Sequence, residues 1–403
     1  MSPTFAASCV NRGAGDPLSI RFVQDLLADT TSADYARIRK AGADGINGSV
    51  TIFGPAEESF FLAEKFITCD DFDNVTGSRN PDGLPDFAGE TISVTSDVAN
   101  SPYSGYIGYS NEEFLKENAV RGFLDAVDTL CRANQYDKET VIRKPGSKVL
   151  VLSSSYLSAY GYYDIRTVSE ASGHRIKVIS PVHSMFDSAA ERHGENASLA
   201  VWTTPEVLGA GVYASASSLI AEKYPSLDYE VLCPDKSDSL EERIISILRL
   251  YRASGKNEKL DAVLVDEMPL SATLLNQTMK RLEEVSDSLL AYKPILSENF
   301  EFIDAAGAVT GECIKYLRTS NQFTHRVAYP DAVFYCTIPL PGMSTDDYNE
   351  DGTFKDSFKY NRAPSSETDT YILAKMESRS VRDSILHTMR RISPKTFELY
   401  VSK

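Results

Sequence analysis

The chain has 403 residues, of which 42% are hydrophobic and 24% are charged, a balance typical of globular proteins. Its net charge of −16 argues against nucleic acid as a partner, because binding a polyanion needs clustered positive charge. No uninterrupted apolar run approaches the length that spans a membrane, and the first residues lack the basic and apolar regions of a signal peptide.

The six cysteines are far apart in the sequence, and none belongs to a CxxC pair or to a Cys/His cluster with zinc spacing. They are Cys9, Cys69, Cys131, Cys233, Cys313 and Cys336. Reduced thiols buried in a core explain this pattern best. We therefore expect a cytoplasmic protein with no bound metal and no cofactor.

Strand and helix signals alternate along most of the chain. Pro55 opens a predicted helix, residues 70–89 form a predicted loop rich in Asp, Asn, Gly and Pro, and residues 112–131 form a long amphipathic helix. Five pairs follow, each a predicted strand and then a predicted helix. The strands are 149–153, 176–179, 199–203, 229–232 and 261–265; the first helix runs up to 168, and the others are 184–192, 206–223, 240–253 and 271–290. This alternation predicts parallel sheets covered by helices. Near the end of the chain, residues 368–391 form a predicted helix with a basic end.

The most informative stretch is residues 150–160, which read Leu-Val-Leu-Ser-Ser-Ser-Tyr-Leu-Ser-Ala-Tyr. A strand runs into a cluster of hydroxyls where a helix begins, which is the place where ligands bind in α/β proteins. Without a gap, the stretch resembles the Leu-Val-Ile-Ala-Cys-Asn-Thr-Ala-Ser-Ala-Tyr pattern of glutamate racemases. The position of that family's catalytic cysteine falls on Ser154.

Further stretches resemble the same family in its own order. They are residues 97–104 (Asp-Val-Ala-Asn-Ser-Pro-Tyr-Ser), residues 199–207 with Gly211 and Tyr213, Cys233-Pro234, Ile303-Asp304 and, faintly, residues 11–15. Together they cover residues 5–28 and 91–320. The resemblance implies an α/β fold of two lobes with mainly parallel sheets and a ligand cleft between them. It places a first lobe at 1–181 with an insertion near 29–90, a second lobe at 182–290, a return to the first lobe at 291–330, and a C-terminal extension at 331–403.

The chain departs from the family at the residues that carry its chemistry. Glutamate racemases remove an α-proton with one cysteine and return it from the opposite face with another. Here Ser154 and Glu267 occupy those two positions, and Asn11 replaces the aspartate that assists the first thiol. A serine hydroxyl is too weakly acidic for this task without an activating partner. We therefore do not expect two-thiol racemisation.

Glu267 is the first candidate catalytic residue, because it ends a predicted strand beside Asp266, and a second carboxylate with burial raises a pKa. The alternative is an acid that stabilises a helix N-terminus. Ser154 and His183 are the other candidates; simple helix capping and a structural histidine are their alternatives. The predicted ligand-binding residues are Asn11, Ser101, Tyr103, Ser104, Ser155, Tyr156, Thr203, Thr204 and Asp266. Tyr160 is a further residue that lines the predicted pocket or packs in the core.

Residues 347–354 fit the first eight positions of an EF-hand loop, but position twelve is Phe358 and prolines occupy the segment where the entering helix belongs. A solvated turn is the better interpretation of this acidic stretch.

These features predict a racemase-like protein that binds a small amino or carboxylic acid and performs one-sided acid/base chemistry of the isomerase or lyase type. The alternative is a catalytically silent homologue that acts as a ligand-binding or interaction protein. We expect a homo-oligomer that binds neither nucleic acid nor membrane. A type I periplasmic binding protein is a third interpretation, since residues 92–109 also resemble that family; the later racemase-like stretches count against it.

Overall fold

A computed structural model describes residues 19–134, 139–173, 176–268, 270–285, 289–340, 342–349, 353–364, 370–377 and 383–402. These residues fall into two units, each with its own sheet: unit 1 contains residues 181–308, and unit 2 contains residues 19–180 and 309–403. The α/β fold with mainly parallel strands is thus observed directly, as the sequence predicted. Across the described ranges, no helix has the length and apolar character that crossing a bilayer requires.

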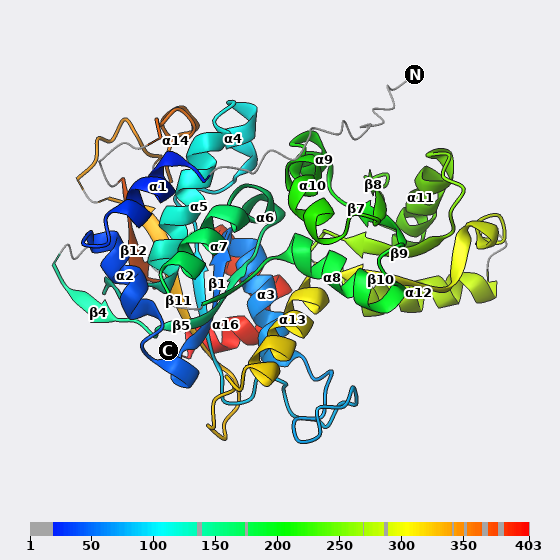
Figure 1. Ribbon diagram of the computed structural model, residues 1–403, viewed down its shortest axis with the longest axis horizontal. Helices are drawn as coiled ribbons and strands as arrows, with labels where there is room; N and C mark the ends of the chain where they lie inside the picture. The colour runs from blue at the N-terminus through cyan, green and yellow to red at the C-terminus, as the bar shows by residue number, and fades with distance from the viewer. Residues whose placement is uncertain are drawn as a thin grey trace. The chain divides into compact units, whose positions relative to one another are not determined.

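Unit 2 is built on an eight-stranded sheet with the order β4-β3-β12-β11-β2-β1-β5-β6 (Figure 1). The strands are β1 Ser49–Gly54, β2 Thr91–Ser96, β3 Leu130–Arg132, β4 Val141–Arg143, β5 Ser147–Leu152, β6 Lys177–Ile179, β11 Asp331–Pro339 and β12 Tyr371–Lys375. The run from β11 to β6 is parallel, whereas β12 pairs antiparallel with β11, and β3 with β4. The central strand β1 is buried at every position, which explains its continuous Val-Thr-Ile-Phe run.

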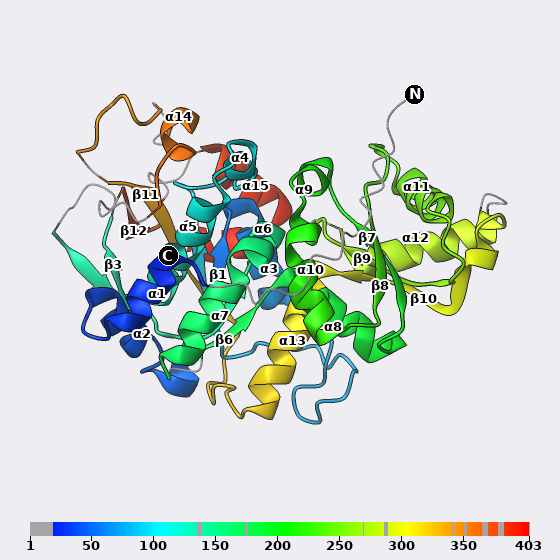
Figure 2. The same cartoon turned by 45° about the horizontal axis from the view of Figure 1, so that its top comes forward.

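Two groups of helices accompany this sheet (Figure 2). One group is α3 Ala56–Thr68, α15 Asp383–Ile392 and α16 Pro394–Val401; the other is α1 Arg21–Ala28, α2 Ala33–Ala41, α5 Glu112–Val127, α6 Ser155–Tyr160 and α7 Tyr162–Ala171. Within them, α1 and α2 pack on α5, while α15 packs on α3 and α16. The short helices α4 Ser104–Gly108 and α14 Asp356–Lys359 lie in loops, and α13 Ala305–Thr319 leads from unit 1 into unit 2.

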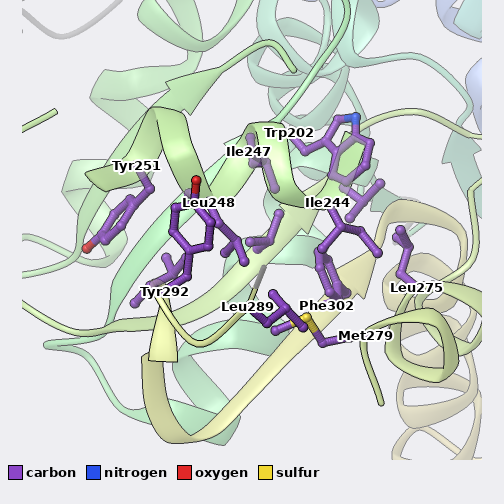
Figure 3. Packing of buried hydrophobic residues seen from close by; sticks show 14 of the residues in the cluster. Trp202, Ile244, Ile247, Leu248, Tyr251, Leu275, Met279, Leu289, Tyr292 and Phe302 are labelled. Carbon is purple, nitrogen blue, oxygen red and sulfur yellow. The ribbon is translucent and has the colours of Figure 1, made fainter. Parts of the chain in front are cut away.

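Unit 1 has a four-stranded parallel sheet with the order β10-β9-β7-β8. The strands are β7 Ser198–Trp202, β8 Asp228–Leu232, β9 Leu260–Val265 and β10 Leu296–Asp304. Its helices are α8 Pro181–His193, α9 Pro205–Gly209, α10 Val212–Lys223, α11 Leu240–Ala253 and α12 Ala272–Val285. The core brings Trp202 and Phe302 from the sheet together with Ile244, Ile247 and Leu248 from α11 (Figure 3).

Helix α11 illustrates why these segments fold as they do. Ser239 caps its first turn by accepting from the Glu242 N–H (3.2 Å), and the first turn carries Glu241 and Glu242, as the helix dipole favours. Ile244, Ile247, Leu248 and Tyr251 recur at helical spacing and are all buried. The resulting apolar stripe fixes the helix on β9 and β10 through the shared core.

The structure corrects two predicted helices. The helix predicted over 112–131 ends at Val127, because the Asp128 side chain accepts from the Leu130 N–H (3.1 Å) and turns the chain into β3. The helix predicted over 368–391 is wrong in its first part, since Tyr371–Lys375 is the strand β12 and α15 begins only at Asp383.

The loop over residues 70–89 is held by its own carboxylates. Asp86 accepts from the N–H groups of Asp71 and Phe72, and Asp70 accepts from those of Asp82 and Gly83. Among the described residues, no group of three His, Cys, Asp or Glu side chains is placed to hold a metal ion. Within the EF-hand-like stretch, the Asn349 N–H donates to the Thr353 carbonyl (2.7 Å), and Tyr348 and Phe354 form an antiparallel bridge.

Candidate functional site

In unit 2, three neighbouring parallel strands end at one edge of the sheet. Beyond the last residues of β5, β1 and β2, the ladder continues by one step: the Ser153 N–H donates to the Phe53 carbonyl (2.8 Å) and the Asp97 N–H to the Gly54 carbonyl (2.7 Å). A Cβ on Gly54, whose φ is +152°, would lie 2.2 Å from the Ser153 Oγ. Glycine is therefore required at position 54, because the last residue of β1 and the residue that follows β5 pack closely there.

The serine cluster that opens α6 lies at this edge and is buried. Ser154 caps the helix, since its Oγ accepts from the Tyr156 N–H (3.3 Å), while Ser153 Oγ lies 2.9 Å from the Ser59 Oγ of α3. Ser155 is the first residue of the helix and is 7% exposed. The capping role of Ser154 is observed; its catalytic role and the ligand-binding roles of Ser155 and Tyr156 stay predictions.

Asp97 is the centre of a buried polar network that follows β2. Its carboxylate accepts from the hydroxyls of Thr337 (2.7 Å) and Tyr103 (2.8 Å) and from the side-chain amide of Asn100 (2.9 Å). Burial raises the pKa of Asp97 above its ordinary value, and the three hydrogen bonds oppose that rise. The Tyr103 hydroxyl is thus committed to Asp97, and burial with the nearby carboxylate raises the pKa of Tyr103 well above its usual range.

A segment near the end of the chain holds the loop that carries Ser101 and Ser104. Lys359 Nζ donates to the Ser101 carbonyl (2.9 Å), and the Tyr360 hydroxyl donates to the Pro102 carbonyl (3.0 Å). Arg362 donates from Nη2 to the Asn100 Oδ1 (2.7 Å). Sequence reasoning missed these partners, because nothing in the spacing of residues 359–362 indicates contact with a loop some 260 positions earlier.

In unit 1, two adjacent parallel strands also end in polar residues. Thr203 and Thr204 follow β7, Asp266 and Glu267 follow β9, and the Asp266 N–H donates to the Trp202 carbonyl (2.8 Å). Thr204 caps α9 by accepting from the Val207 N–H (3.4 Å), and Thr203 is buried. Burial and the neighbouring Asp266 raise the pKa of Tyr213, so Asp266 lies against a neutral phenol.

Glu267 is held by two side chains that the sequence did not reveal. Its Oε2 accepts from the Trp202 indole N–H (3.2 Å) and forms an ion pair with Arg243 of α11. The Arg243 guanidinium also lies 4.9 Å from the centre of the Trp202 ring. Arg243 and Trp202 therefore hold the Glu267 carboxylate at the carboxyl end of β9.

The remaining predicted residues are less closely tied to these edges. His183 lies in the first turn of α8 and is half-buried, so its catalytic role stays a prediction. Tyr160, at the end of α6, is 7% exposed. Asn11 lies outside the described residues.

No protein-family model matches the chain, and no curated protein matches it. Among solved structures, it is similar to the glutamate racemase of Francisella tularensis in complex with D-glutamate, with 13% identity, a TM-score of 0.42, and 72% of this chain and 88% of the racemase covered. For the Bacillus anthracis isoform RacE1 the identity is 15%, the TM-score 0.40 and the coverage 71% and 87%. For an arylmalonate decarboxylase the values are 15%, 0.30, and 56% and 91%. Similarity of this strength establishes no activity for this chain.

Proposed function

We propose that the protein binds a small amino or carboxylic acid and acts on it by one-sided acid/base chemistry, without a cofactor, with Glu267 as the base. One observation carries the proposal. In each unit, the stretches that resemble glutamate racemases lie at the carboxyl ends of neighbouring parallel strands, β5 and β2 beside β1 in unit 2, and β7 and β9 in unit 1. Such edges are where α/β proteins bind ligands.

The hydroxyls and backbone amides of these edges suit a carboxylate. The Ser154-Ser155 turn and the loop over residues 100–105 offer uncharged donors, which bind an anion better than a cation or an apolar group. Glu267, at the corresponding edge of unit 1, supplies a carboxylate that accepts a proton in the proposed reaction. Ser154 and Glu267 belong to different units, and their action on one ligand is part of the proposal.

Two-thiol racemisation is not proposed, because the described cysteines do not supply the thiolates. Burial raises the pKa of Cys131 to about 11 and that of Cys336 to about 12. Burial also raises the pKa of Cys69, Cys313 and Cys233. A thiol with a raised pKa is a poor source of the thiolate that acts as nucleophile or base. We expect no interconversion of the enantiomers of glutamate or aspartate, measured by chiral chromatography with NMR detection of solvent deuterium at Cα.

A second candidate function is a silent homologue that binds the same class of ligand. The observation that favours it is the pairing of the Glu267 carboxylate with Arg243 and Trp202. A carboxylate in these contacts has to leave them before it can accept a proton. Ser154, similarly, already serves as a helix cap.

Calorimetry with a panel of amino acids and dicarboxylic acids tests the binding, and product analysis tests the turnover. Ser155→Ala is expected to weaken binding by about 1–3 kcal/mol, the cost of losing a hydrogen bond to a charged group. Glu267→Gln is expected to spare binding and abolish turnover. Ser169→Ala is the matched control, since Ser169 is a buried helix serine of the same unit that donates to the Ile176 carbonyl (2.8 Å).

The outcomes separate the alternatives. Equal affinity in Ser155→Ala and the native chain would remove the proposed binding site. Binding without turnover in the native chain would leave the silent homologue, and equal turnover in Glu267→Gln would require a different base.

A further inference from the structure

Unit 2 contains a cavity that none of the predicted site residues lines. It has a volume of about 620 Å³ and lies among α1, α2, α5, β3 and β12. All of its lining residues belong to unit 2. A cavity of this size is in the range that holds small organic ligands.

Two buried polar groups line this cavity without a hydrogen-bond partner among the described residues. Asn118 is 1% exposed; its Nδ2 donates to the Tyr106 hydroxyl (3.1 Å), and its Oδ1 has no partner. Turning the amide over would exchange the two atoms and still leave one of them unpaired. The Tyr371 hydroxyl is in the same situation. Buried polar groups are normally satisfied, so a ligand that carries matching groups would complete these two.

Four arginines and three aspartates line the cavity: Arg37, Arg121, Arg132 and Arg362 against Asp34, Asp125 and Asp128. Arg37 donates to Asp34 (3.2 Å) and Asp128 (2.7 Å) and is also paired with Asp125, so one guanidinium contacts all three carboxylates. Burial acts to lower the pKa of Arg37, but Asp125 and Asp128 raise it above its ordinary value. Because the arginines of the lining outnumber its aspartates, the lining presents no excess of negative charge to an anion.

Arg121 and Arg132 are the lining arginines whose terminal nitrogens can donate to a ligand. Arg121 Nε donates to the Glu117 Oε1 (2.9 Å), and its guanidinium lies 4.4 Å from the centre of the Phe22 ring. Among the described residues, the two terminal nitrogens of Arg121 have no hydrogen-bond partner, and these are the nitrogens that grip a carboxylate in parallel. Phe22, Phe114 and Leu124 give the same cavity an apolar wall.

We propose that this cavity is a second binding site, for a small organic anion that has an apolar body and a hydroxyl or amino group. The anionic group binds Arg121 and Arg132, the apolar body packs on Phe22 and Phe114, and the hydroxyl or amino group meets Asn118 and Tyr371. Each part of the ligand would thus contact a lining group of the matching chemical kind.

Titration calorimetry of the full chain with 4-hydroxybenzoate tests the proposal, with phenol and benzoate as the probes that lack one of the two polar groups. The test variant is the double substitution Glu117→Gln/Arg121→Gln, because removing Arg121 alone would take the ion-pair partner away from the buried Glu117 carboxylate. Arg166→Gln is the matched control: Arg166 also pairs with a glutamate one helical turn away, Glu170, and also lies over a tyrosine ring.

We expect 4-hydroxybenzoate to bind the native chain and Arg166→Gln equally, and the double variant at least about tenfold more weakly, as loss of a charged hydrogen bond implies. Phenol and benzoate should each bind more weakly than 4-hydroxybenzoate. No binding at millimolar concentration, or equal binding in the double variant, would refute the site. Loss of binding in Ser155→Ala instead would assign the probe to the β5 edge and equally refute it, whereas failure of the proposed function leaves this result untouched.

Discussion

Lys144 carries an amino group that is fully enclosed in unit 2. Its Nζ donates to the carbonyls of Ala126 and Asp128 and lies 5.2 Å from the centre of the Tyr335 ring. Burial lowers the pKa of Lys144 to about 8, because the charged form loses its hydration. Its ordinary value is 10.5, so the folded and unfolded chains bind different numbers of protons over an interval that experiments can reach.

Between about pH 8 and pH 10.5, the unfolded chain keeps the Lys144 proton that the folded chain has released. Stability therefore rises with pH in this interval relative to Lys144→Met, which cannot titrate. The free energy of unfolding of the native chain minus that of the variant should increase by about 3 kcal/mol, the equivalent of the pKa difference. Urea unfolding of both proteins at pH 7 and pH 10.5 measures it. A difference that does not change with pH would contradict the lowered pKa of Lys144.

At the level of single residues, the sequence predicted which residues stand at the ends of strands better than it predicted which side chains contact them. Ser155 and Glu267 were predicted as site residues because each stands two or three positions after an apolar run that ends a strand. Arg243, which holds Glu267, comes from a helix whose rotation on the sheet is set by its whole buried stripe. No local pattern states which of its charged residues faces a strand end.

Helix α5 approaches β1 closely because Gly122 has no side chain. A Cβ on Gly122 would lie 2.1 Å from the Phe53 ring, which is fully buried. Gly122→Ala is therefore expected to destabilise the protein by about 1–3 kcal/mol through overpacking, although alanine favours the helix by about 1 kcal/mol. Urea unfolding measures the change.

Gly311 in α13 is the matched comparison, since nothing lies within 4 Å of the Cβ it would gain. Gly311→Ala should stabilise the protein by up to about 1 kcal/mol. The double variant Phe53→Leu/Gly122→Ala should lose less stability than the two single substitutions sum to, because the smaller side chain makes room. Equal effects of alanine at both glycines would contradict the close packing of α5 on β1.

At the level of elements, the alternation of strands and helices over residues 149–285 was predicted because its two periodicities are long and regular. The strand β12 was missed for a physical reason. The stretch Tyr-Ile-Leu-Ala is apolar over four residues, which suits a strand or a helix equally. Pairing with β11, more than thirty residues earlier, makes it a strand, and that pairing has no local signal.

The chain contains a single tryptophan, and Trp202 is fully buried in the core of unit 1 beside Phe302. Its emission therefore reports on unit 1, whereas far-ultraviolet circular dichroism reports on the helices of both units. Each unit buries its own core, so we expect Gly122→Ala to lower the midpoint of the circular dichroism transition and to leave the tryptophan midpoint unchanged. A common shift of both midpoints would mean that the two units unfold as one.

The order of segments along the chain has a consequence for synthesis. Within the described residues, unit 2 begins before unit 1 and is completed after it, because β11 pairs with β2 and β12 pairs with β3. A ribosome that adds about 5–20 residues per second delivers β11 roughly ten to fifty seconds after β2. During that delay β2 presents an open edge, which is a template for pairing with other chains. Nascent or truncated chains that stop before residue 331 should therefore depend on holdase chaperones.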